Sequence, residues 1–104
     1  MEHLQYDFKE AGGETRTGQA YVLTGVVASG NLEVMMQPQN LSGACRFVID
    51  TAANGFAASW QAVLEDFMRR HRPANLLVSI NDHAASPAVV SLRIDQAYEL
   101  LTER

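Results

Sequence analysis

The chain contains little cysteine and little lysine, and it has no long apolar run. Cys45 is the single cysteine, which excludes an internal disulfide and favours a reducing compartment. No stretch approaches the roughly 20 apolar residues of a membrane-spanning helix. A secretory signal has a basic region followed by an apolar block, and residues 1–5 do not show this pattern. These features predict a cytoplasmic protein that does not contact a membrane.

Several kinds of chemistry are also absent from the sequence. The net charge of −4 and the absence of a basic run argue against nucleic acid as a partner. His3, His71 and His83 lie far apart, which predicts no metal site. Asp82-His83 is an adjacent acid–imidazole pair, but neighbours on a strand end point apart. No nucleophile elbow or phosphate-binding glycine loop occurs, so we predict no catalytic residues.

The length of the chain is sufficient for one domain, which we predict over residues 1–104. Its 47% apolar and 19% charged residues are ordinary for a globular protein. At this length a chain buries roughly two thirds of its unfolded surface, so it needs no disulfide or metal for stability. Cys45 lies in an alternating segment, which favours a buried thiol over a nucleophile.

A β-hairpin is predicted around Ser29. Residues 18–27 and 32–37 alternate with the two-residue period of strands. Between them lie Gly30 and Asn31, which tolerate the positive φ of tight turns. Ser29 is therefore expected at or beside the tip. It is either an ordinary turn serine or a hydroxyl exposed for covalent modification, and the pattern alone does not decide between them. Lys9 is the only lysine, so this tip has no site for biotin or lipoate.

The remaining elements follow in order. Strands are predicted over residues 3–8, 44–51 and 75–82, with loops over 10–17 and 81–85. A helical stripe runs from Phe56 through Trp60 to Met68, with Asn54 as the expected N-cap and Pro73 as the stop. The basic residues 69–72 either end this helix or bind a phosphate or carboxylate.

The C-terminal segment is ambiguous between two structures. Ser86-Pro87 is typical of a helix start, and Val90, Ile94, Ala97, Tyr98 and Leu101 form a helical stripe, which predicts a helix over 87–103. Residues 88–94 also alternate like a strand, and Leu92 lies off the helical stripe. With the helix, the order predicts an α+β domain: a largely antiparallel sheet with two helices packed on one face.

The sequence resembles a known family. The run Gly-Val-Val-Ala-Ser-Gly-Asn-Leu-Glu-Val, residues 25–34, resembles the prosthetic-group segment of the acyl-carrier (delta) subunit of malonate decarboxylase. The likeness continues through Asn54-Gly55, the helix containing Trp60, residues 82–87 and residues 89–93, so it covers nearly the whole chain. A more distant likeness connects the chain to the acyl-carrier (gamma) subunit of citrate lyase.

The resemblance implies a carrier subunit that does no catalysis itself. In that family the serine that matches Ser29 carries 2'-(5''-phosphoribosyl)-3'-dephospho-CoA through a phosphodiester bond. The terminal thiol of this group holds acetyl and malonyl groups as thioesters. The implied partners are an acyl transferase subunit, a decarboxylase pair of subunits and the enzyme that attaches the prosthetic group. Ser29 follows alanine, unlike the Asp-Ser-Leu serine of phosphopantetheine carriers, so the usual pantetheinyl transferase is not the expected modifying enzyme.

Two alternatives remain open from the sequence. The first is an acyl carrier of a citrate-lyase-like complex. The second is a small α+β binding or regulatory domain that is never modified and in which Ser29 only forms the turn.

Overall fold

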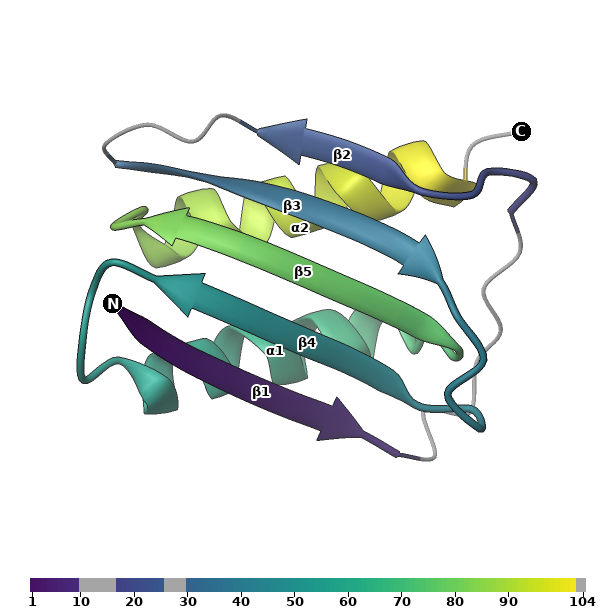
Figure 1. Ribbon diagram of the computed structural model, residues 1–104, viewed down its shortest axis with the longest axis horizontal. Coiled ribbons are helices and arrows are strands. Elements are labelled where there is room, and N and C mark those ends of the chain that lie inside the picture. The colour runs from purple at the N-terminus through teal and green to yellow at the C-terminus, as the bar shows by residue number, and fades with distance from the viewer. Residues whose placement is uncertain (10–16, 26–29, 103–104) are drawn as a thin grey trace.

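The computed structural model describes residues 1–9, 17–25 and 30–102 (Figure 1). Five strands and two helices occur in these ranges. In chain order they are β1 (Glu2–Phe8), β2 (Val22–Gly25), β3 (Asn31–Pro38), β4 (Cys45–Thr51), α1 (Ala57–His71), β5 (Leu76–His83) and α2 (Pro87–Thr102). Ser29 and most of the predicted loop 10–17 lie outside the described residues.

The strands form one sheet in the order β1-β4-β5-β3-β2. All neighbours pair antiparallel except β4 and β5, which are parallel and are connected through α1. Both helices cover the same face of the sheet, which lies in front of them in Figure 1. The predicted α+β class and the packing of both helices on one face are confirmed.

The core lies between this face and the helices. Alternate residues of the central strands are buried, as the period-two pattern predicts, and the single cysteine is among them. Burial raises the pKa of the Cys45 thiol to about 12, so it is inert at neutral pH. The helices contribute the predicted stripes. Besides Cys45, the buried apolar core contains Val22, Leu32, Val34, Met36, Phe47, Ile49, Leu76, Val78, Ile80, Trp60, Leu64, Phe67, Met68, Val90, Ile94, Ala97 and Leu101.

The start of α1 differs from the prediction. The helix begins at Ala57, and Phe56 rather than Asn54 occupies the N-cap position, with no side-chain cap. Gly55 explains the difference, because its φ of +84° is not helical and delays the helix. Phe56 was predicted in the apolar stripe, but it precedes the helix and is 53% exposed.

The start of β2 and the end of β5 also differ from the prediction. Among the described residues β2 begins at Val22 rather than at residue 18. Val22 pairs with Met36 and β3 ends at Pro38, so little of β3 remains for earlier residues to pair with. Conversely, β5 extends to His83, through positions predicted as loop, because His83 pairs with Asn31.

The C-terminal segment is a helix and not a strand. The Ser86 hydroxyl oxygen accepts a hydrogen bond from the Val89 N–H at 3.3 Å, as expected of an N-cap. Leu92, which lies off the stripe, is 57% exposed. The Ser86 N-cap and the helical stripe thus decide the structure of this segment, and the strand-like alternation of residues 88–94 does not. Neither this helix nor α1, the two helices in the described ranges, is long and apolar enough to cross a membrane.

The basic end of α1 is engaged within the fold. Arg69 and Arg70 donate to Asp66 at 3.1 and 2.9 Å, and Arg70 also donates to Asp95 of α2 at 3.0 Å. His71 lies 3.2 Å from the same Asp95 carboxylate. The pairs with Asp66 lie within α1 and those with Asp95 connect the two helices, which favours the helix-end interpretation of the basic cluster over an anion site.

Gly25 is the position where the hairpin tolerates no side chain. Its φ is +99°, and a Cβ there would overlap the carbonyl oxygen of Leu32. We expect Gly25→Ala to lower the free energy of unfolding by roughly 2–3 kcal/mol. Gly18→Ala is the control, since a Cβ at Gly18 meets nothing within 4 Å. Urea denaturation measures both, and equal stabilities of the two variants would contradict the prediction.

Candidate functional site

The hairpin around Ser29 is confirmed by the strands on either side of it. β2 pairs with β3, from Val22 opposite Met36 to Gly25 opposite Glu33. Ser29 itself lies outside the described residues, so its position at the tip stays a prediction. Gly30, the next residue, has a φ of +76° and donates its N–H to the carbonyl oxygen of His83 at 2.7 Å. This hydrogen bond connects the hairpin, just before β3 begins, to the end of β5.

A guanidinium group lies at the base of the hairpin. Arg93, on α2, donates from Nη2 to the side-chain oxygen of Asn31 at 3.2 Å and from Nη1 to Gln96 at 3.0 Å. Its Cδ would lie 3.2 Å from a Cβ at Gly25. Its Nε is buried and has no hydrogen-bond partner among the described residues. Both bonds are to neutral amides, so the charge of Arg93 is not neutralised by either.

Asp82 organises the loop that leads from β5 to α2. Its side chain is buried on the helix face of the sheet and accepts three hydrogen bonds. The donors are the Thr51 hydroxyl at 2.8 Å and the N–H groups of Ala84 at 3.3 Å and Ala85 at 3.0 Å. His83 points to the other face because it is the next residue on the strand. The predicted separation of this acid–imidazole pair is therefore confirmed.

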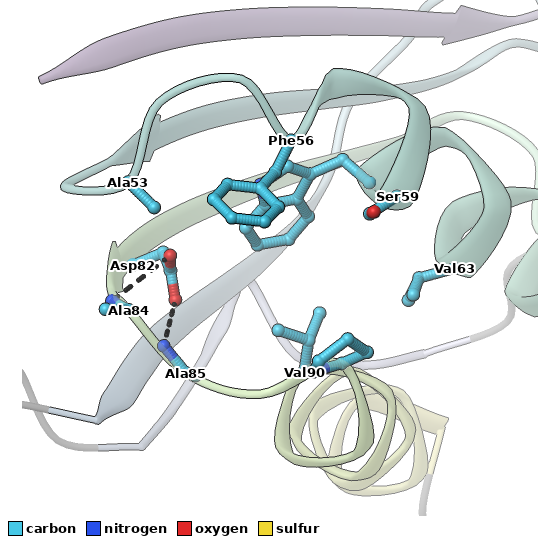
Figure 2. Close-up of a pocket in the computed structure, with 10 residues that line it drawn as sticks. Ala53, Phe56, Ser59, Val63, Asp82, Ala84, Ala85 and Val90 are labelled. Atoms are coloured by element: carbon cyan, nitrogen blue, oxygen red, sulfur yellow. Dashed lines mark hydrogen bonds between the residues drawn. The ribbon is translucent and has the colours of Figure 1, made fainter.

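A pocket of about 300 Å³ opens beside Asp82 (Figure 2). It lies between the first turns of α1 and α2, with Phe56 across from Val90 and Asp82 across from Val63 in Figure 2. Most of its walls are apolar; the polar groups are Asp82 and Ser59. The other lining residues are Ala53, Trp60, Ala84, Ala85 and Pro87.

The pocket and the hairpin lie at the same end of the sheet. β4 and β5 run parallel and both end there, at Thr51 and His83, and β3 begins opposite His83. Periodicity did not reveal this pocket, since its residues come from two separate connections of the chain, β4 to α1 and β5 to α2, and from the elements next to them. Arg93 was missed for the same reason: its spacing within α2 says nothing about which strand it reaches. Within the described ranges, no three His, Cys, Asp or Glu side chains cluster as metal ligands.

Sequence comparison first defines the class, a carrier subunit. Residues 19–101 match the family of acyl carrier proteins described as malonate decarboxylase delta subunit (MdcD). A malonate decarboxylase acyl carrier protein of Xanthomonas euvesicatoria pv. vesicatoria (strain 85-10) is 54% identical over 101 residues, which cover 97% of this chain and 95% of that protein. One from Burkholderia cepacia is 50% identical over 97 residues, covering 93% and 87%.

A solved structure agrees with the sequence relatives. A chain in the crystal structure of a Pseudomonas malonate decarboxylase hetero-tetramer in complex with malonate superposes with a TM-score of 0.83 at 35% identity. The match covers 97% of this chain and 99% of that one. The protein therefore belongs to the malonate decarboxylase acyl carrier protein family. The resemblance to the malonate decarboxylase carrier, inferred from residues 25–34 and later segments, is confirmed.

Removing the Asp82 carboxylate tests its role in the loop. Asp82→Ala leaves the buried Thr51 hydroxyl and two N–H groups without their acceptor, so we expect a loss of about 2–4 kcal/mol in the free energy of unfolding. Asn81→Ala, one residue earlier and on the opposite face, is the control and should cost less than about 1 kcal/mol. Thermal and urea unfolding would measure both. Comparable losses would show that the carboxylate has no special role.

Proposed function

We propose that the chain is the non-catalytic acyl carrier of a malonate decarboxylase, with 2'-(5''-phosphoribosyl)-3'-dephospho-CoA attached to Ser29 through a phosphodiester bond. This covalent group is called the arm below. When bound, the arm supplies a terminal thiol that carries acetyl and malonyl groups as thioesters. The work of the protein is then to hold the arm, to orient its base and to dock on the subunits that use it.

The arrangement around the hairpin fits an anionic attachment. A phosphodiester carries a negative charge, and the overall net charge of −4 would repel it. Arg93 at the hairpin base provides the opposite charge together with an unused, buried Nε donor. This is the observation on which the proposal most depends, because a merely structural turn has no need of a cation that, within the described ranges, has no acidic partner.

The rigid base of the hairpin supports the tethering role. β3 is hydrogen-bonded on both sides, to β2 and β5, and Gly30 is attached to His83. A group fixed to such a base reaches each partner at a high effective concentration. The partners we propose are an acyl transferase subunit, a decarboxylase pair and the enzyme that attaches the arm, all in the cytoplasm.

Mass spectrometry tests the attachment site. In protein purified from its native host growing on malonate, we expect an adduct of the mass of the arm on the peptide containing Ser29, and no adduct in Ser29→Ala. Ser42→Gly is the matched control: Ser42 is exposed, also precedes a glycine, and has a φ of 56° that glycine tolerates. It should remain modified at Ser29. An unmodified Ser29 under these conditions would overturn the proposal.

The contribution of Arg93 is tested by a thermodynamic cycle. We expect the modified protein to lose about 1 kcal/mol more than the unmodified protein on Arg93→Gln, since only the former has a phosphodiester to pair with. Arg93→Lys should restore part of this coupling. Arg46→Gln is the control, because Arg46 pairs with Asp7 at the other end of the sheet. Unfolding free energies of both forms give the coupling, and equal values for Arg93 and Arg46 would refute it.

A further inference from the structure

We propose that the pocket beside Asp82 receives the acyl end of the arm, and that it takes the neutral acetyl thioester in preference to the malonyl thioester. The inference rests on the proposed attachment at Ser29. The pocket is the one between the first turns of α1 and α2. Three observations support it: the position of the pocket, the character of its walls and the charge on one side of it.

The pocket lies within reach of the attachment point. Gly30, which follows Ser29 in the chain, is hydrogen-bonded to His83, and the next two residues, Ala84 and Ala85, line the pocket. From β3 across β5 to β4 is two strand spacings, about 10 Å. An arm with the many rotatable bonds of a pantetheine chain spans this distance, so its end can fold back onto the protein.

The walls suit a small apolar group. Of the lining residues, Trp60 and Val90 are almost fully buried, while Phe56 is exposed although it is a large apolar side chain. A volume of about 300 Å³ is at the lower limit of ligand pockets. It accommodates an acetyl thioester and the adjoining end of the arm, but not the whole arm.

The charge of Asp82 selects between the two acyl groups. Its carboxylate lines the pocket and is held by the Thr51 hydroxyl and two backbone N–H groups. A malonyl group would bring a second carboxylate into the same apolar space, where desolvation and like-charge repulsion both oppose it. The N-termini of α1 and α2 attract anions only weakly, since residues 57–59 and 86–88 are exposed and water screens them.

The expected consequence is a sorting of the two thioesters. The acetyl form would be sheltered from water and from adventitious nucleophiles while the carrier waits for the transferase. The malonyl form would remain in solvent, accessible to a decarboxylating partner. The carrier would thus contribute more than a tether, without any bond-breaking step of its own.

Trp60 is the natural reporter, because it is the only tryptophan and lines the pocket. We would record its fluorescence and its indole N–H resonance in the unmodified, thiol, acetyl and malonyl forms. The acetyl form should differ from the other three. In parallel, hydroxylamine should cleave the acetyl thioester about fivefold more slowly than free acetyl-pantetheine. This ratio corresponds to a pocket that the acetyl group occupies about four-fifths of the time. The malonyl thioester should show no such protection against its own free standard.

Two exposed positions in the first turn of α1 provide matched variants. Ser59 lines the pocket and Ala58 does not, and neither contributes to the buried core. Ser59→Leu should fill the pocket and abolish the protection and the Trp60 signal, whereas Ala58→Leu should leave both unchanged. Circular dichroism would verify that both variants are folded.

The outcomes separate this inference from the proposed function. Intact mass first establishes whether Ser29 carries the arm. If it does and Trp60 responds equally to acetyl and malonyl loading, or to neither, the pocket inference is wrong and the carrier function stands. If Ser29 is unmodified, the carrier proposal fails, and titration of unmodified protein with S-acetyl-N-acetylcysteamine still tests the pocket. A Trp60 change that requires a partner subunit, whatever the acyl group, would instead identify the pocket as a docking site and overturn the inference.

Discussion

The end of β5 is the constraint on which the functional end of the molecule depends. This strand is central in the sheet, with β3 on one side and β4 on the other. Its last two residues act in opposite directions. The carbonyl oxygen of His83 accepts the N–H of Gly30 and so attaches the hairpin, while the side chain of Asp82 reaches the helix face and attaches Thr51 and the following loop. A shift of this strand by one residue would exchange these two roles and expose the carboxylate.

The interior of the sheet is what makes that end rigid. Phe47 packs edge-on against Phe8 and Phe67, and Phe67 packs edge-on against Tyr98, so β1, β4 and both helices share one aromatic chain. The pairs of Arg70 and His71 with Asp95 connect the last turn of α1 to the middle of α2. Neither feature touches the hairpin. They fix the positions of the helix starts, between which the pocket opens.

Much of this fold was predictable because its elements repeat a local period. Alternation identified β1, β3 and β4, and apolar stripes identified both helices, since each depends only on residues a few positions apart. The errors occurred where one backbone angle or one distant partner decides the outcome. Gly55 delays α1 through its positive φ, and Asn31 extends β5 to His83 by pairing with it. The site shows the same division: Ser29 was predicted from the turn pattern and the family resemblance and stays a prediction, whereas Arg93 and the pocket depend on contacts between distant segments.

Charge connects the two parts of the candidate site. Arg93 contacts Asn31, the first residue of β3, and Asp82 is next to the last residue of β5, so both lie at the same end of the sheet. Arg93 is a cation at the hairpin base, and Asp82 is an anion in the pocket. An arm fixed through a phosphodiester is anionic where it leaves the protein and, in the acetyl state, neutral at its far end. The two side chains match this order along the arm. Replacing the acetyl end by malonyl changes only the far end, so the attachment is unaffected while the pocket is disfavoured. Under the proposed function, the same protein surface would therefore hold the arm continuously and still distinguish its acetyl form from its malonyl form.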